Sequence, residues 1–355
     1  MINVSKGLDL PISGSPAIKI SDEPKISSVA VLSNDFVGMK PTMFVKANDK
    51  VKVGQKIFED KKNPGVYFTS PAGGTVKSIN RGAKRRFLSI EIDIDANEEY
   101  ELFNLGTTTN EIKTALLDSG LWNGFRTRPF NRTPKVDDNA DAVFINCCDT
   151  NPLSVDPYEI IKEDKSLFDE GIKILSKLFD CEIHLTYQNN RFDTSNKDIN
   201  YHHVSGPHPA GLSSTHISKI YPVSLKRIVW TINYQDIISI GYLFKNYKIR
   251  THKIIALGGP NAFEPSLIKV RPSANIDEIT AGKTKENSRL ISGSVLHGHA
   301  SEGVMNYLGY YDSQISCISD ELNDSFMSWL NPGSKLHSKL NVFLSSIIKP
   351  KDFIF

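Results

Sequence analysis

Residues 36–76 constrain the fold of this chain most, because they consist of short alternating segments separated by turn residues. Val51 and Val53 follow the two-residue period of a half-buried strand. Residues 63–65 (Asn-Pro-Gly) predict a tight turn, since proline fixes φ and glycine accepts a positive φ. The glycine pair at residues 73–74 predicts a second turn that leaves no room for a Cβ atom. We therefore predict a small all-β module here, not a helix.

The size and composition of the chain predict a globular protein of more than one domain. Its 355 residues are enough for two or three domains. A hydrophobic content of 39% and a charged content of 23% are ordinary for such a protein, and a net charge of +2 indicates no nucleic-acid partner. No apolar run is long enough to span a bilayer. The few cysteines form no CxxC pair, which predicts reduced thiols in a cytoplasmic protein: Cys147, Cys148, Cys181 and Cys317.

Beyond the β module, the pattern changes to alternating strands and helices. The period from residue 109 predicts a helix that ends near Gly120, and helices are also predicted at 167–179 and 234–244. Strands are predicted at the apolar runs 140–148, 182–187, 229–233 and 254–260. This alternation predicts a parallel, Rossmann-like sheet.

The domain organisation follows from these patterns. We expect an extended segment at 1–25, the β module at 26–100, the Rossmann-like domain at 101–256, a small α+β domain at 257–318 and a helical segment at 319–355. Turns are predicted at 290–294 and 309–311, and a break in the last segment at 331–333. The final four residues resemble a cut strand, so we expect the chain to be truncated at the C-terminus.

Two motifs have a functional and a structural interpretation. Lys61 and Lys62 precede a turn, as the modified lysine of lipoyl and biotinyl domains does, but the flanking residues differ and a scaffold is favoured. Four histidines could bind a metal, yet no helical spacing or nearby cysteine completes a zinc set. We favour ordinary hydrogen bonds for them and predict no metal site: His202, His203, His208 and His216.

The segment that starts at Phe125 carries two arginines between two aromatic residues, Phe125 and Phe130. Arginine stacks on aromatic rings and donates hydrogen bonds to carbonyl oxygens, so Arg126 and Arg128 could hold a planar, partly polar ring. Structural arginines that fix a contact between domains are an equally good interpretation. No Gly-x-Gly-x-x-Gly or Walker A sequence follows a predicted strand, which disfavours dinucleotide binding.

These motifs together resemble a known family, the A subunit of the sodium-translocating NADH:quinone reductase. The matching segments run in order from residue 7 to about residue 333. They include Gly7-Leu8-Asp9-Leu10-Pro11-Ile12, Val37-Gly38-Met39-Lys40-Pro41-Thr42-Met43, Arg126-Thr127-Arg128-Pro129-Phe130, Asp149-Thr150-Asn151-Pro152-Leu153, Ser205-Gly206-Pro207-His208-Pro209-Ala210-Gly211 and Ile232-Asn233-Tyr234-Gln235-Asp236.

The resemblance implies a peripheral subunit on the cytoplasmic face of the bacterial inner membrane, in a complex that oxidises NADH, reduces ubiquinone and exports Na⁺. It implies an α+β multidomain fold with a lipoyl-like module, a Rossmann-like domain similar to the flavin subunit of respiratory complex I, and a ubiquitin-like β-grasp (SLBB) domain. Other subunits carry the flavins, the iron–sulfur centre and the NADH site, so no bound cofactor is expected here. Family chains continue past residue 355, in agreement with truncation. Flavin-binding relatives have a glycine-rich loop where this chain has bulky residues from Phe125 to Phe130, which predicts loss of the flavin.

Our hypothesis is that two loops approach each other and line a surface for the ubiquinone headgroup or for the membrane B subunit of the complex. The first loop contributes Val37, Gly38, Met39, Lys40 and Pro41, and the second contributes Phe125, Arg126, Arg128, Pro129 and Phe130. Met39 and Phe130 supply apolar contact, and Arg126 or Arg128 donates to a quinone oxygen. No catalytic residue is assigned, and the isolated chain is not expected to turn over. The alternative is a purely structural assembly subunit with no ligand of its own.

Overall fold

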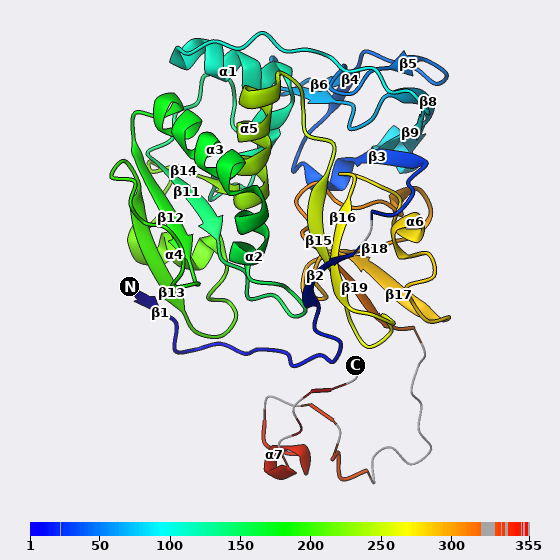
Figure 1. Ribbon diagram of the computed structural model, residues 1–355, viewed down its shortest axis with the longest axis vertical. Helices are drawn as coiled ribbons and strands as arrows, with labels where there is room; N and C mark the ends of the chain where they lie inside the picture. Colours follow the sequence, from blue (N-terminus) through cyan, green and yellow to red (C-terminus); the bar gives the residue numbers. More distant parts are fainter. Residues whose placement is uncertain are drawn as a thin grey trace.

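The computed structural model describes residues 1–21, 23–320, 331–334, 336–337, 340–348, 350 and 352–353. It contains an all-β unit, an α/β unit and a third unit built on a second large sheet, packed side by side (Figure 1). We call these the β module, the α/β unit and the C-terminal unit. No helix among the described residues is long and apolar enough to cross a membrane.

The β module confirms the all-β prediction for residues 36–76. It has a four-stranded sheet in the order β3-β9-β8-β5 and a three-stranded sheet in the order β4-β6-β7. Phe58 and Phe68 stack in its core with ring centroids 4.5 Å apart. Its elements are β3 (Ser28–Leu32), η1 (Ser33–Asp35), β4 (Pro41–Met43), β5 (Lys50–Val51), β6 (Lys56–Asp60), β7 (Tyr67–Thr69), β8 (Gly74–Arg81), η2 (Ala83–Arg85) and β9 (Phe87–Ile94).

Gly65 lies in the predicted turn, whereas Gly74 is the first residue of strand β8 and not part of a turn, although the predicted lack of room for a Cβ atom is confirmed there. Gly65 has a φ of +89° in the turn between β6 and β7, a conformation that other residues rarely adopt. Gly74 opens β8 beside Asp93, and a Cβ atom at Gly74 would overlap the backbone oxygen of Asp93. Lys61 and Lys62 are exposed at the same turn as Gly65.

The α/β unit is a six-stranded sheet in the order β1-β13-β12-β11-β14-β10, parallel except for β10. The predicted parallel sheet is therefore present. Its elements are β1 (Ile2–Asn3), α1 (Thr109–Asp118), η3 (Leu121–Gly124), β10 (Arg126–Arg128), β11 (Ala142–Cys147), α2 (Pro157–Ile161), η4 (Lys162–Asp164), α3 (Lys165–Leu178), β12 (Glu182–Tyr187), β13 (Asn200–Ser205), α4 (Ser213–Ile220), β14 (Val229–Asn233) and α5 (Tyr234–Asn246).

Strand β11 is buried on both faces, which explains its continuous apolar sequence. Val143 and Ile145 belong to the large core that includes the helices α3 and α5. Phe144 points to the opposite side, where it joins Ile217 of α4 in a separate cluster. The helices therefore cover both faces of the sheet, as Figure 1 shows.

Helices α3 and α5 touch through two glycines. A Cβ atom at Gly241 of α5 would overlap the backbone oxygen of Leu167, and one at Gly171 of α3 would overlap that of Ile237. Close backbone contact of this kind requires residues without side chains. The start of α1 is fixed differently, by a capping box between Thr108 and Glu111.

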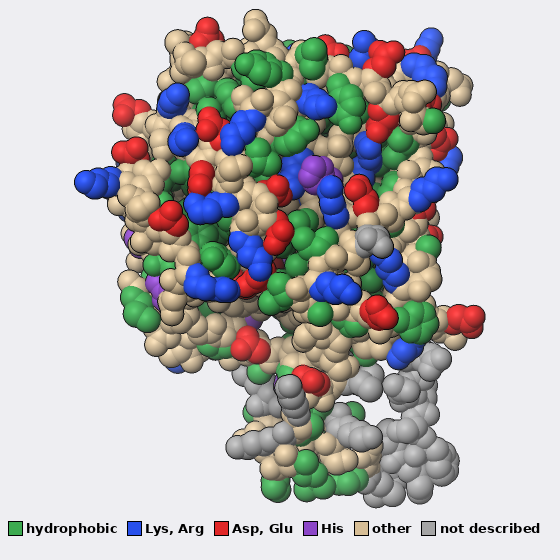
Figure 2. Space-filling model, in the orientation of Figure 1, with side chains coloured by type: hydrophobic (Ala, Val, Ile, Leu, Met, Phe, Trp, Pro, Cys, Tyr) green, Lys and Arg blue, Asp and Glu red, His purple; other side chains and the backbone are tan. Residues whose placement is uncertain are grey.

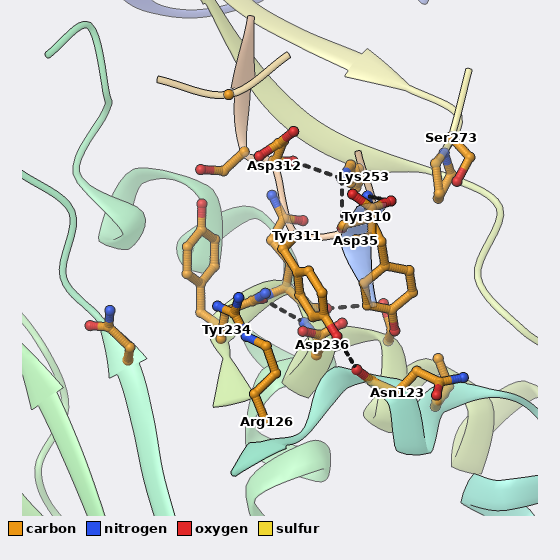
Figure 3. A pocket seen from close by; sticks show the side chains of 18 of the residues that line it. Asp35, Asn123, Arg126, Tyr234, Asp236, Lys253, Ser273, Tyr310, Tyr311 and Asp312 are labelled. Carbon is orange, nitrogen blue, oxygen red and sulfur yellow. Dashed lines mark hydrogen bonds between the residues drawn. The ribbon is translucent and has the colours of Figure 1, made fainter. Parts of the chain in front are cut away.

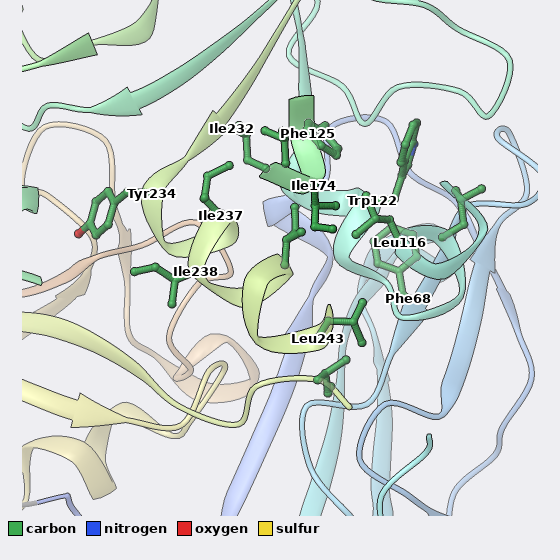
Figure 4. Close-up of a cluster of buried hydrophobic side chains, with 14 of the residues drawn as sticks. Phe68, Leu116, Trp122, Phe125, Ile174, Ile232, Tyr234, Ile237, Ile238 and Leu243 are labelled. Carbon is green, nitrogen blue, oxygen red and sulfur yellow. The ribbon is translucent and has the colours of Figure 1, made fainter. Parts of the chain in front are cut away.

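The β module and the α/β unit share one hydrophobic core (Figure 4). Phe68 of β7 lies in the same cluster as Leu116 of α1 and Ile237 of α5. Polar bonds reinforce the contact: Thr69 Oγ1 donates to the backbone oxygen of Ser119 at 2.9 Å. These two units are therefore packed as one body.

The C-terminal unit is α+β, as predicted for this region, and has its own core of buried aliphatic side chains. Its sheet runs in the order β18-β17-β19-β15-β16-β2. The predicted turn at 290–294 is wrong for residues 290–292, because they pair antiparallel with β19. The elements are β15 (Lys253–Gly258), β16 (Ser266–Val270), α6 (Ile276–Thr280), β17 (Ser288–Ser292), β18 (His299–Ala300), η5 (Gly303–Met305) and β19 (Gln314–Ser319).

The N-terminal segment links two sheets. β1 pairs in parallel with β13 of the α/β unit, whereas β2 (Ala17–Ser21) pairs with β16 of the C-terminal unit. At the other boundary, β15 lies in the C-terminal sheet. The change of unit therefore comes before Lys253, not at residue 256 as the sequence pattern predicts.

Part of the predicted C-terminal helical segment, residues 321–330, lies outside the described residues. Among the described residues that follow, only α7 (Ser345–Ile348) is helical. Large apolar side chains of this segment are exposed, and they include Leu340, Val342, Ile347 and Ile348. Apolar side chains gather at the lower end of the molecule in Figure 2, whereas charges of both signs are mixed over the rest of that face.

Candidate functional site

A cavity of about 390 Å³ lies where the three units meet (Figure 3). Asn146 and Cys148 reach it from the carboxyl end of β11, and Asn233 and Tyr234 from that of β14. These strands are neighbours in the sheet, but β12, which follows β11 in the chain, lies on the other side of β11. Ligands of open α/β sheets bind at such a switch point, so this cavity is the candidate site.

At the switch point, a ligand would meet side chains, because the nearby backbone N–H groups already have hydrogen-bond partners within the chain. The side chain of Asn233 accepts hydrogen bonds from the backbone N–H groups of Gln235 and Asp236, at 2.8 and 3.0 Å, and so caps α5. After β11, Asp149 Oδ1 accepts from the backbone N–H of Asn151 at 2.8 Å. Amides that bind phosphate in dinucleotide sites are occupied here by the chain itself.

Arg126 and Arg128 face the cavity from strand β10, not from the loop that the sequence predicts. β10 pairs antiparallel with β14, and strand alternation puts both arginines on one face with Thr127 buried on the other. The Arg126 guanidinium lies 4.2 Å over the ring of Tyr311. The Tyr311 hydroxyl donates to the backbone oxygen of Asn123 at 2.7 Å, which fixes the ring.

The donors of the two arginines are not used up by the protein. Within the described part of the chain, the Arg126 guanidinium makes no hydrogen bond, and Arg128 Nε is buried without a partner. Burial, with a smaller contribution from the charge of Arg126, lowers the pKa of Arg128 to about 10. Both side chains therefore present positive charge and free N–H donors to a ligand in the cavity.

A buried lysine stands between the units. Lys253, the first residue of β15, donates from Nζ to the backbone oxygens of Gly309, Tyr310 and Asp312, at 3.3, 3.2 and 2.7 Å. These bonds hold the loop that carries Tyr310 and Tyr311 against the cavity. Burial lowers the pKa of Lys253, whereas the carboxylates of Asp312, Asp236 and Asp35 raise it.

Three carboxyl groups surround this lysine, one from each unit. Burial, with a smaller contribution from Asp312, raises the pKa of Asp35 to about 7. Burial likewise raises the pKa of Asp236 to about 6. Tyr310 links the two, because its backbone N–H donates to Asp35 at 2.9 Å and its hydroxyl is hydrogen-bonded to Asp236. Carboxyl groups with such pKa values exchange protons at neutral pH.

The loop of residues 37–41 lies beside the cavity, not in it. Val37 is 47% exposed, Lys40 is exposed, and Met39 and Pro41 are half-buried. The neighbouring Phe36 does line the cavity. The loop comes close to the arginine segment through Gly38, since a Cβ atom there would lie 3.6 Å from Nε of Arg132.

The second predicted segment divides into three parts. Pro129 and Phe130 are exposed, Phe130 by 50%. Arg126 and Arg128 face the cavity. Phe125 does not lie on any surface: it is fully buried, with its ring 5.4 Å from Trp122 and 5.8 Å from Trp230. The expected surface role of Phe125 is wrong, because this side chain is part of the core.

The histidines of the β13–α4 region make ordinary hydrogen bonds, as predicted. His202 Nε2 lies 3.1 Å from Nδ1 of His184, and His216 bonds through both ring nitrogens inside the core. No group of three metal-binding side chains occurs among the described residues. The remaining two histidines bond to Gln188 and Thr150, respectively: His203 and His208.

Sequence reasoning missed the residues that give the cavity its charge. Asp35, Asp236, Lys253 and Asp312 are far apart in the chain and form no motif. The available signal was position: Asp236 is the third residue after a predicted strand, near the end where side chains of parallel sheets reach a switch point. Tyr310 and Tyr311 were visible only as a predicted turn.

Three family models match successive parts of the chain. The NqrA N-terminal barrel-sandwich hybrid domain matches residues 2–95, the NqrA second alpha/beta domain residues 107–249, and the NQRA C-terminal domain residues 254–303. Among solved structures, an NAD⁺-reducing NiFe hydrogenase in the air-oxidised state aligns with 63% of this chain and 47% of its own, at 13% identity. Its TM-score of 0.39 is too low to support an argument.

Named relatives match the whole chain. The A subunit of the Na(+)-translocating NADH-quinone reductase of Yersinia pseudotuberculosis serotype I (strain IP32953) is 42% identical over 364 residues, which cover 100% of this chain and 81% of that protein. Its namesake from Neisseria meningitidis serogroup B (strain ATCC BAA-335 / MC58) is 43% identical over 366 residues, with the same coverage. The chain therefore belongs to the family of the A subunit of the Na(+)-translocating NADH-quinone reductase, an oxidoreductase complex.

Proposed function

We propose that this chain binds the headgroup of ubiquinone in the cavity between its three units, with Arg126 as a hydrogen-bond donor to a quinone oxygen. The family relates the chain to a complex that reduces a quinone. The quinone ring is planar and apolar with two carbonyl acceptors, so a suitable site combines aromatic walls with a few donors. Phe36, Phe68 and Tyr311 supply such walls here.

The observation that carries the proposal is the state of Arg126. Its guanidinium is stacked 4.2 Å over Tyr311 and makes no hydrogen bond to the described protein residues. Stacking on the ring fixes the orientation of the guanidinium group while its N–H donors stay free. A carbonyl oxygen in the cavity can therefore accept a charge-assisted hydrogen bond without displacing a protein partner.

The test is a titration of a soluble ubiquinone analogue against this chain and against Arg126→Ala. A lost hydrogen bond to a charged group is worth ~1.5–3 kcal/mol, so the variant should raise the Kd by about 10- to 100-fold. Arg132→Ala is the control, because Arg132 is an exposed arginine on the neighbouring loop and does not line the cavity. Equal, unsaturable binding to all three proteins would rule out the quinone site.

We further propose that the exposed loop tips dock on the membrane B subunit, which holds the chain at the cytoplasmic face of the inner membrane. Val37 and Phe130 are large, apolar and about half exposed. Their two loops lie close together, because Gly38 of the first loop is next to the side chain of Arg132, just after Phe130. Exposed apolar side chains of this kind suit a protein interface. Phe130→Asp should weaken capture of the B subunit by this chain, whereas Leu225→Asp, on another exposed loop, should not.

The second candidate function is a purely structural assembly subunit. Capture of the B subunit without any quinone binding would favour it. Whether or not the chain binds quinone, we propose that flavin and iron–sulfur centres belong to other subunits. We also propose that residues 26–100, 101–252 and 253–319 form three domains. Their folds would be lipoyl-like, Rossmann-like and β-grasp, in that order. An unmodified intact mass would exclude a carrier role for Lys61 or Lys62.

A further inference from the structure

Two carboxyl groups from different units approach one glycine, Gly309, which precedes the cavity-lining residue Tyr310. A Cβ atom at Gly309 would come within 3.1 Å of Asp35 Oδ1 and would overlap Asp312 Oδ2. Asp35 comes from the β module, and Asp312 from the loop before β19 (Figure 3). Both residues line the cavity, so both carboxyl groups are close to any ligand inside it.

Each carboxyl group of this pair accepts a hydrogen bond from the protein on one oxygen, so its remaining oxygen can carry a proton. Asp35 accepts from the backbone N–H of Tyr310 at 2.9 Å, and Asp312 accepts from the hydroxyl of Ser292 at 2.7 Å. The ammonium group of Lys253 does not donate to either carboxylate, since its bonds go to backbone oxygens. The pair is therefore held in position without a direct ion pair to this lysine.

The positive charges around Asp35 and Asp312 are too few to neutralise the carboxyl groups of this region. Asp35 faces Asp312, Lys253 and Arg126, and Asp236 faces the same two cations together with the hydroxyl of Tyr310. His299 lies 4.0 Å from Asp312. Three carboxyl groups thus share the two cations Lys253 and Arg126. Protonation of one carboxyl group removes the excess negative charge, and burial with repulsion from Asp312 raises the pKa of Asp35 to about 7.

We propose that Asp35, beside the like charge of Asp312, holds a proton and donates it to a quinone oxygen when the quinone is reduced; this inference rests on the proposed quinone site. Reduction adds two electrons, which the complex takes from NADH, and two protons. One carboxyl O–H bond breaks as an O–H bond forms on one quinone oxygen. The second quinone oxygen takes its proton from solvent, and a further solvent proton restores the carboxyl group of Asp35.

The test uses the whole complex containing either the natural chain or Asp35→Asn, an isosteric change that keeps an acceptor for the Tyr310 N–H. The rate of reduction of a soluble ubiquinone analogue by NADH is measured from pH 5.5 to 9. General acids contribute about 100- to 10,000-fold to proton transfer, so the variant should reduce the rate at pH 6 by at least about 10-fold. Loss of activity above a pH of about 7 in the natural complex should be absent in the variant.

Two controls separate proton donation from damage to the protein. NADH oxidation by ferricyanide, an acceptor that takes up no proton, should be unchanged in Asp35→Asn. Asp137→Asn, which alters an exposed carboxylate outside the cavity, should leave both activities unchanged. Asp312→Asn removes the like charge beside Asp35, so it should move the alkaline loss of activity to lower pH instead of abolishing it.

The outcomes distinguish this inference from the quinone site itself. If the natural chain binds the quinone analogue saturably but the pH profile of Asp35→Asn matches that of the natural complex, the proton-donor role is wrong and the quinone site stands. If the natural chain shows no saturable binding, both proposals fail. Saturable binding by Asp35→Asn with a loss of rate only in quinone reduction supports the proton donor.

Discussion

The half-buried residue Asp35 has a raised carboxyl pKa, which predicts a pH-dependent cost to folding that does not involve any ligand. Its pKa is about 7 in the folded chain, against an ordinary value of 3.8. Between these values the folded chain keeps a proton that the unfolded chain releases, so raising the pH weakens folding. Well below pH 3.8 the group is protonated in both states and contributes no pH dependence.

The magnitude follows from these values. Between pH 5.5 and the folded pKa of about 7, each pH unit costs ~1.4 kcal/mol, which gives a loss of about 2 kcal/mol by pH 8. Asp35→Asn cannot ionise and still accepts the backbone N–H of Tyr310. Relative to the natural chain, the variant should therefore gain about 2 kcal/mol in the free energy of unfolding between pH 5.5 and pH 8.

Urea unfolding followed by tryptophan fluorescence at the two pH values measures this gain. Asp137→Asn, at an exposed position, is the control and should show no pH-dependent difference. A stability difference between Asp35→Asn and the natural chain that stays constant, or falls, as the pH rises would refute the reasoning. It would mean that Lys253 and Arg126 stabilise the ionised carboxylate more than burial and Asp312 destabilise it.

Other features of the fold give further predictions. Phe125→Ala should lower the free energy of unfolding by ~3–5 kcal/mol in a urea titration because it empties a fully buried site, whereas Val37→Ala should change it by less than about 0.5 kcal/mol. Gly241→Ala should lower it by ~1–3 kcal/mol although alanine favours helices, because the added Cβ overlaps a backbone oxygen of α3; a higher melting temperature would contradict this. Arg271→Gln breaks the paired bonds to Glu98, at 2.8 and 2.5 Å, that join the C-terminal unit to the β module, so limited proteolysis should cleave the variant between these units faster than the natural chain.

The elements that the sequence predicts correctly are those with a local signal. The β module follows from alternation and turn residues, and α1 from its capping box and apolar period. Strand β11 follows from a continuous apolar run, because both of its faces are covered. Each of these signals comes from neighbouring residues, so neighbouring side chains determine the outcome.

Predictions failed where distant contacts decide. Arg126 and Arg128 lie in a strand because β14, which is far away in the sequence, pairs with them. Residues 290–292 become a strand in the same way, through β19. An aromatic residue such as Phe125 looks the same in the sequence whether it is buried or exposed, and only the rings around it decide which.

The site combines both cases. Arg126 was recognisable because two arginines stand close together between aromatic residues. The carboxyl groups were not, since Asp35, Asp236 and Asp312 come from three different units and meet only when these units pack. A sequence pattern records chemistry within one segment, whereas a buried charge cluster is a property of the interfaces between segments.

The position of the cavity makes its chemistry depend on the packing of all three units. The β module and the α/β unit share a core, and Lys253 binds the loop with Tyr310 and Tyr311 through three backbone oxygens. Separation of the C-terminal unit would expose Asp35 to water and remove Asp312, so the pKa of Asp35 would return toward its ordinary value. A ligand that touches all three units stabilises the packed arrangement by the free energy of its own binding. Proton affinity, ligand binding and packing of the units are therefore linked through the same few side chains.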